Sequence, residues 1–290
     1  MTDTQVASPS PGSPSGDVSA IASATPAGAG GTRFKLPGWA GGVIGVLIIL
    51  AVWWVASITL WQSSNSIPTP VEVFAKFFDG DEWSRLWTNA QGTISAALWG
   101  ALWGNLAAIA LATVVLLIPV LEGIVTQIAI TTYCIPLVAI GPICVIVAGR
   151  DSPQGASIVL AALSVFFTTV VGCLLGFRAA PRTSMDLVRA YGGGRWTQLR
   201  KVQVIAALPN LVAALKISAP AAFLGAVLAE YLGSGGDASL GRALIAAQTQ
   251  SDAPQLWYLA LASGLIAGAG YALVGLVGRF VTPWAAGRAT

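Results

Sequence analysis

Residues 155–177 read GASIVLAALSVFFTTVVGCLLGF, a run of 23 residues that contains no Asp, Glu, Lys or Arg. At a helical rise of about 1.5 Å per residue, such a run can cross the roughly 30 Å hydrocarbon core of a bilayer. Because the bilayer core holds no water to pair with the backbone, the peptide groups must bond to one another, as they do in a helix. The run therefore predicts a transmembrane α-helix.

Five further apolar runs of similar length occupy most of the remaining chain. Ten-residue alternating segments, which are typical of a membrane barrel, do not occur. The sequence predicts an all-α integral membrane protein with six transmembrane helices. The other five runs are about Trp39–Trp61, Thr93–Pro119, Ile124–Ala148, Leu208–Tyr231 and Leu256–Val277.

The composition agrees with a membrane protein and excludes several other classes. Of the 290 residues, 55% are hydrophobic and only 9% are charged, against about 25% charged in an ordinary soluble domain. The net charge of +3 is too small to imply a nucleic-acid partner. The chain contains no His, which removes the commonest general base and zinc ligand. We expect no catalytic site, no cofactor and no metal site, and we interpret Cys134, Cys144 and Cys173 as packing residues.

The chain divides into a tail and a membrane domain. Residues 1–34 are rich in Ser, Pro, Gly, Ala and Thr and predict a disordered cytoplasmic tail. Residues 35–290 form the predicted membrane domain. If the N-terminus lies inside, the inner segments hold 10 Lys or Arg and the outer segments 4. By the positive-inside rule, both termini are predicted to be cytoplasmic.

The longest predicted exterior segment is 62–92. Pro68 and Pro70 prevent a helix through its start. Val71, Phe74 and Phe78 then recur at helical spacing. We expect a short amphipathic helix along the outer interface.

The predicted cytoplasmic connection 178–208 is long and basic. Met185 to Tyr191 can form a short helix with Leu187 and Tyr191 on one side. Residues 192–194 are three successive glycines that turn the chain. A second helix from Arg195 would align Trp196, Leu199 and Val202 in one stripe. A helix, a glycine turn and a helix just outside the membrane are suited to docking on a cytoplasmic protein.

At this connection the chain resembles bacterial ABC importer permeases of the binding-protein-dependent type. That family carries Glu-Ala-Ala, three residues, Gly, nine residues and Ile-x-Leu-Pro. Asp186 stands here for the Glu, Gly192 for the Gly and Val202 for the Ile, whereas Leu187, Val188 and Ile205 depart from the motif. Further matches to the nitrate, sulfonate and taurine subfamily are Ile67-Pro68-Thr69-Pro70, Ala206-Ala207-Leu208-Pro209, Ala229-Glu230 and Ser239-Leu240-Gly241.

The resemblance implies a type I importer permease fold in the bacterial inner membrane, with several partners. These are two ABC ATP-binding subunits, an extracytoplasmic solute-binding protein and a second permease, as a homodimer or heterodimer. The chain lacks a Gly-Lys pair, so it cannot bind ATP through a phosphate-binding loop of the G-x-x-x-x-G-K-[ST] type. The resemblance assigns ATPase docking to Asp186, Leu187, Arg189, Ala190, Tyr191, Gly192, Arg195, Trp196, Leu199 and Val202.

A possible pathway or gate is expected at the prolines and charges within the spans. Pro136 and Pro142 predict a bent third span, and Pro220 a kinked fifth span. Lys216 and Glu230 are functional candidates as intramembrane charges, although both could instead extend to the interface. The alternative function is a gradient-driven secondary transporter, for which inverted repeats and central acids are expected but not seen.

Overall fold

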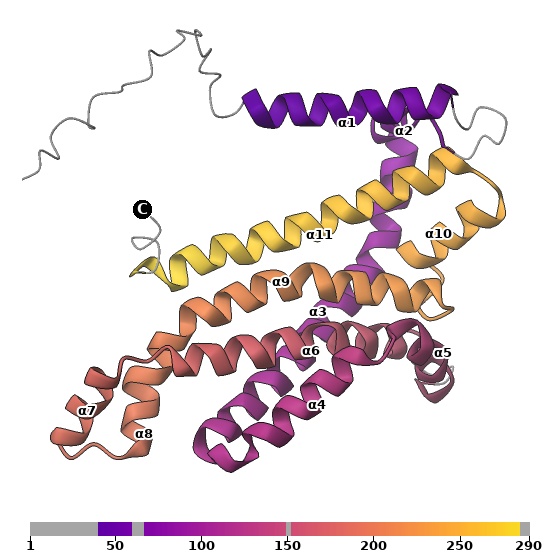
Figure 1. Ribbon diagram of the computed structural model, residues 1–290. Helices are drawn as coiled ribbons and strands as arrows, with labels where there is room; N and C mark the ends of the chain where they lie inside the picture. The colour runs from indigo at the N-terminus through magenta and orange to yellow at the C-terminus, as the bar shows by residue number, and fades with distance from the viewer. Residues whose placement is uncertain (1–39, 60–66, 149–151, 285–290) are drawn as a thin grey trace, which may run out of the picture. The chain divides into compact units, whose positions relative to one another are not determined.

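The computed structural model describes residues 40–59, 67–148 and 152–284 (Figure 1). All regular structure in these ranges is helical. The chain divides into two units, 1–48 and 49–290, and the description below concerns the second. Helix α1 (Ala40–Thr59) crosses the boundary between them. The tail predicted over residues 1–34 lies outside the described residues.

Five described helices are long and apolar enough to cross a membrane, and a bent pair adds a sixth span if it is counted as one. The bent pair consists of α4 (Glu122–Cys134) and α5 (Leu137–Ala148). The predicted all-α membrane fold is thus confirmed, with five to six spans. The five long helices are α1, α3 (Gly80–Leu117), α6 (Gly155–Arg178), α9 (Val204–Tyr231) with the short helical segments that precede it, and α11 (Ala253–Val281).

The proline-containing spans differ from each other in a way that the sequence did not predict. The chain bends by 92° between α4 and α5, where Ile135 is extended immediately before Pro136. A residue before proline avoids the helical region, which explains the break. Pro142 lies inside α5, and Pro220 lies inside α9, and both helices continue through these residues.

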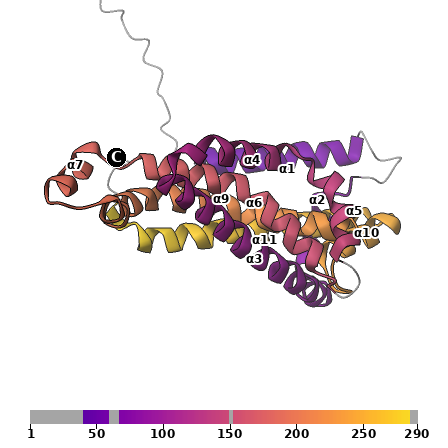
Figure 2. The same ribbon diagram turned by 90° about the horizontal axis from the view of Figure 1, so that it is seen from below.

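Small residues allow the central helices to approach closely. Helix α6 packs against both α3 and α9 (Figures 1 and 2). A methyl group at Gly100 of α3 would lie 2.3 Å from the Cβ of Ala161, and one at Gly172 of α6 would lie 2.4 Å from that of Ala214. Close packing of this kind drives helix association in lipid, where the hydrophobic effect does not act between helices. The buried face of α3 repeats a small residue every four positions: Ala96, Gly100, Gly104, Ala108 and Ala112.

Replacing Gly100 with Leu is expected to separate α3 from α6. Overpacking of this type costs about 1–3 kcal/mol even where neighbours can move, and the nearest atoms here include the backbone of Ile158. The measurements are the thermal midpoint and the monodisperse fraction in detergent. Gly268→Leu is the matched control, because no atom lies within 4 Å of a methyl group at Gly268. Equal losses in the two variants would contradict the packing assignment.

Two helical segments flank the spans at one end of the bundle. Helix α2 (Pro70–Phe77) confirms the predicted amphipathic helix, and Thr69 and Glu72 form its capping box. Helix α3 begins at Gly80, 13 residues before the predicted start of its span at Thr93, because Asp79 caps a polar first segment. Helix α10 (Leu240–Thr249) was not predicted.

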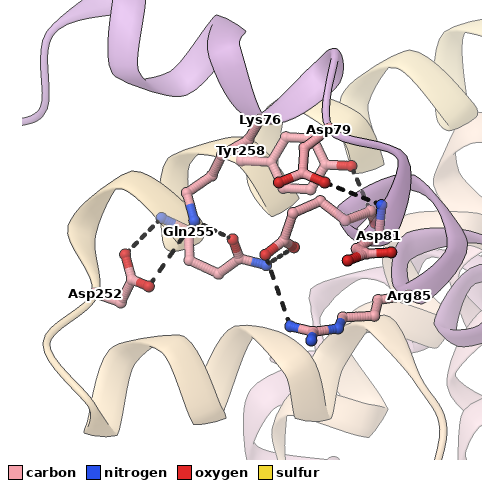
Figure 3. A network of polar contacts seen from close by, with 8 residues as sticks. Lys76, Asp79, Asp81, Arg85, Asp252, Gln255 and Tyr258 are labelled. Carbon is pink, nitrogen blue, oxygen red and sulfur yellow. Dashed lines mark hydrogen bonds and ion pairs between the residues drawn. The ribbon is translucent and has the colours of Figure 1, made fainter.

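A network of polar contacts holds α2 and the start of α3 against α11 (Figure 3). The Lys76 ammonium donates to the Gln255 amide oxygen at 2.7 Å, and the Gln255 amide nitrogen donates to Glu82 at 2.9 Å. Lys76 also lies 4.0 Å from Asp252, which caps the first turn of α11. The network therefore connects α2 and the start of α3, which are adjacent in the sequence, to α11, which is remote from both.

Candidate functional site

The segment between α6 and α9 forms a helical hairpin beyond the bundle (Figures 1 and 2). It comprises α7 (Arg182–Ala190) and α8 (Arg195–Gln198). We call this end of the bundle the hairpin end and the opposite one the α10 end. The predicted helix, glycine turn and helix are confirmed, with α7 beginning three residues earlier than predicted. An ion pair between Arg178 and Glu122 ties the base of the hairpin to the α3–α4 connection.

The glycine turn has a defined hydrogen-bonding pattern. The Gly193 N–H donates to the Val188 carbonyl at 2.8 Å, and the Gly192 N–H donates to the Arg189 carbonyl at 2.9 Å. Gly192 has a φ of +77°. These features make a Schellman motif, in which a left-handed residue ends the helix and satisfies its last carbonyls. The motif glycine at position 192 is therefore the residue that reverses the chain.

The hairpin presents large apolar side chains without a cover. Leu187 is 59% exposed, Tyr191 85% and Trp196 64%. We call these three residues the hairpin patch. An exposed apolar group of this size on a polar, basic segment is typical of a protein interaction surface.

The side chains of the predicted stripe, Trp196, Leu199 and Val202, differ in exposure. Leu199 is only 6% exposed, and Val202 is half-buried. Residues Leu199–Gln203 form a π-helical turn, η2, directly after α8. Trp196 therefore faces solvent while Leu199 packs inward.

The charged residues of α7 line one side of a cavity of about 710 Å³ at the base of the hairpin. Asp186 lies 3.8 Å from Arg189 on exposed α7. Ala190 and Arg195 are exposed as well, so most of the predicted docking residues lie on one accessible hairpin. The cavity lining includes Val115, Glu122, Phe177, Arg178, Arg182 and Asp186.

Glu230 lies at the α10 end and is only 1% exposed, so the interpretation that it extends to the interface is wrong. Its carboxylate accepts from the Thr93 hydroxyl at 2.7 Å and from the Gly241 N–H at 3.1 Å. The Leu240 N–H donates to the Thr93 oxygen at 3.0 Å. Glu230 thus caps the start of α10, where a negative charge complements the helix dipole.

This arrangement brings together two sequence motifs, Ala229-Glu230 and Ser239-Leu240-Gly241. A methyl group at Gly241 would lie 2.4 Å from the Glu230 Cβ, so only glycine allows the approach. Sequence reasoning missed Thr93, which joins both motifs to α3. The sequence feature that could have indicated this role is a hydroxyl group at the start of an apolar run.

The remaining pathway candidates lie apart from Glu230. Pro136 and Pro142 belong to the bent pair α4–α5. Lys216 and Pro220 lie one turn apart within α9. The Lys216 ammonium sits 4.7 Å from the centre of the Tyr271 ring, and the structure does not pair it with Glu230.

The comparison with known families decides the class of protein. Residues 100–288 match the family described as Binding-protein-dependent transport system inner membrane component. The chain belongs to this family. The permease is therefore a multi-pass inner-membrane transport protein and not a catalytic enzyme, as predicted.

Individual relatives support the same assignment. The riboflavin transport system permease protein RibX of Chloroflexus aurantiacus is 28% identical over 88% of this chain and 93% of its own length. SsuC of Bacillus subtilis, whose name links it to the transport of aliphatic sulfonates, is 28% identical over 69% of this chain and 72% of its own. The formylaminopyrimidine transport permease protein ThiX of Halalkalibacterium halodurans is 22% identical over 82% of this chain and 93% of its own length.

Proposed function

We propose that the permease forms the translocation pathway of an ATP-driven importer for a small solute. An extracytoplasmic binding protein delivers the solute at the α10 end. Two ATP-binding subunits dock at the hairpin end, which is cytoplasmic. The distribution of Lys and Arg along the sequence supports this orientation, because the segments predicted to be cytoplasmic, which include the hairpin, hold 10 and the predicted outer segments hold 4.

The observation that carries the proposal is the hairpin patch on a hairpin closed by Gly192. A helix presented beyond the bundle can follow the motion of an attached subunit and transmit it to α6 and α9. Closure of the ATP-binding subunits would move two such hairpins together and open the pathway to the other side. This mechanism requires that the helix bundles have two discrete arrangements. Binding of nucleotide to the partner subunits then shifts the populations of the two arrangements.

A second permease completes the pathway, as another copy of this chain or a similar protein. We assign the lining to α4–α5 and α9. A bend such as the one at Pro136 and a proline such as Pro220 free backbone carbonyls, which are tolerated at membrane depth where they line a cavity. Cysteine substitutions along these helices should be accessible to water-soluble reagents, and uniform protection would contradict the assignment.

Replacing Leu187 with Asp is expected to weaken ATPase docking at least tenfold. The exposed Leu187 side chain would be buried by the partner, and a carboxylate there would lose hydration without a compensating contact. The measurement is co-purification of the co-expressed ATP-binding subunit with the tagged permease, followed by solute-stimulated ATP hydrolysis. Leu187→Met is the matched control, since it keeps an apolar side chain of similar size. Undiminished co-purification with Leu187→Asp would remove the hairpin patch from the docking surface.

A further inference from the structure

Lys216 is the one charged residue near the middle of a membrane-spanning helix in the described part of the chain. It lies 12 residues after Val204 and 15 before Tyr231, the two ends of α9. At about 1.5 Å per residue, these separations are roughly 18 and 22 Å. A lysine side chain is too short to bring its ammonium to either end.

The Lys216 side chain packs against Gly275 and Tyr271 of α11. A methyl group at Gly275 would lie 3.1 Å from the Lys216 Cε, so the glycine leaves room for the aliphatic stem. The ammonium lies over the Tyr271 ring, 4.7 Å from its centre. An aromatic face attracts a cation but does not neutralise its charge.

The Lys216 ammonium lies between two residues of α11, 3.5 Å from a methyl group built at Gly275 and 4.7 Å from the centre of the Tyr271 ring. Gly270 of α11 lies beside Ala219, which is further from Val204 than Lys216 is. Tyr271 follows Gly270 directly, so its backbone lies close to this level of α9. The interpretation that Lys216 extends to the interface therefore does not fit its position.

The charge of Lys216 has no acidic partner within the described residues. Glu230 lies 14 positions further along α9 and is engaged with Thr93 and Gly241. A lysine facing lipid at this depth is costly. Pro220 has no N–H to bond the carbonyl of Lys216, four residues earlier, so a free acceptor lies beside the charge. Lys216 is half-buried, and its charge is less costly where the exposed part meets water or a polar solute than where it meets lipid.

We propose that Lys216 recognises anionic solutes on the translocation pathway. The inference rests on the proposed function and specifies its substrate class: a small organic anion with a sulfonate, carboxylate or phosphate group. The ammonium attracts the anion into the membrane, and its contact with the Tyr271 ring holds the ammonium in place. Because the ring does not cancel the charge, the anion can bind and leave.

The test measures the electrostatic potential at Lys216 in the complete transporter with its ATP-binding subunits and binding protein. Cys134, Cys144 and Cys173 are replaced by Ala, and a single reporter cysteine is placed at Ala213 or at Ile217, which flank Lys216 on α9. The probes are two water-soluble thiol reagents of similar size, the anionic sulfonatoethyl and the cationic trimethylammonioethyl methanethiosulfonate. Binding-protein-stimulated ATP hydrolysis is measured on the same samples.

A positive charge on an aqueous pathway should favour the anionic reagent. We expect the ratio of anionic to cationic reaction rates to fall about tenfold on Lys216→Gln and on Lys216→Met, and to persist in Lys216→Arg. The two neutral variants differ in polarity, so misfolding of one does not remove the comparison.

Three outcomes would overturn the inference. Protection of both reporters shows that the lysine does not face water, and an unchanged ratio shows that its charge does not act on solutes. Loss of the preference for the anionic reagent in Lys216→Arg shows that this preference depends on the shape of the side chain and not on its charge. If these occur while stimulated ATP hydrolysis is intact, the proposed importer function stands and only the anion site fails. Absence of stimulated hydrolysis in the parent transporter would contradict the proposed function itself.

Discussion

Replacing Gly192 with Asp is expected to abolish ATP-coupled transport while the permease still inserts in the membrane. Gly192 has a φ of +77°, and its N–H and that of Gly193 close the end of α7. A side chain in this conformation costs about 1–2 kcal/mol. The hairpin has few buried contacts to absorb that strain, so it should rearrange and displace the hairpin patch.

The matched control is the same substitution two residues later. Gly194 has an extended backbone and caps the N-terminus of α8, and no atom lies within 4 Å of a methyl group there. Aspartate is a favoured residue at such a cap. Gly194→Asp should therefore keep coupling although it adds the same charge.

The measurement for both glycine variants is the ratio of transported solute to ATP hydrolysed in proteoliposomes, with membrane insertion checked by yield. Wild-type coupling in Gly192→Asp would show that the turn is not needed for coupling. An equal loss in Gly194→Asp would assign the effect to charge and not to backbone geometry.

Replacing Glu230 with Leu is expected to cause the largest loss of stability among single substitutions at the α10 end. The change leaves the Gly241 N–H without its acceptor and leaves the Thr93 hydroxyl with only a longer bond, of 3.4 Å, to the Asn89 carbonyl. Each buried donor without a partner costs about 1–3 kcal/mol. Helix α10 also loses the negative charge at its N-terminus, an additional cost of about 0.3–1 kcal/mol. The midpoint of thermal unfolding in detergent should fall strongly, and transport should fall with it.

Two further variants separate the hydrogen bonds from the charge. Glu230→Gln keeps one side-chain oxygen as an acceptor and should be less damaging than Glu230→Leu. Asp237→Asn removes an acid from the same end, where Asp237 is exposed and pairs with Arg242 at 3.1 Å, and should change stability little.

A double-mutant cycle tests whether Thr93 and Glu230 act as one unit. Thr93→Val removes the hydroxyl that bonds both Glu230 and the Leu240 N–H. Since the two residues share one network, the destabilisation by Thr93→Val and Glu230→Gln together should be smaller than the sum of the single effects. Strict additivity would contradict a shared network.

Much of the fold follows from hydropathy and proline. The apolar run 155–177 became α6 (Gly155–Arg178), one residue longer. The hairpin turn was predictable as well, because Gly192 lies directly after an amphipathic segment. The polar first segment of α3 and helix α10 were missed: the first is short of apolar residues, the second has only 10 residues, and both depend on caps. Asp79 provides the cap for the first, and Glu230, a residue of another helix, provides it for the second.

Sequence alone determined that this chain is a helical membrane protein with a basic hairpin, because apolar length, charge asymmetry and a glycine turn are local properties. Only the tertiary structure decided where the intramembrane charges lie. Glu230 and Lys216 look alike as isolated charges on one apolar helix. Packing buries Glu230 against Thr93 and Gly241, whereas it leaves Lys216 over Tyr271 with no acid beside it among the described residues. The difference arises because the neighbours of a buried charge come from other helices, whose register the sequence of one helix cannot specify.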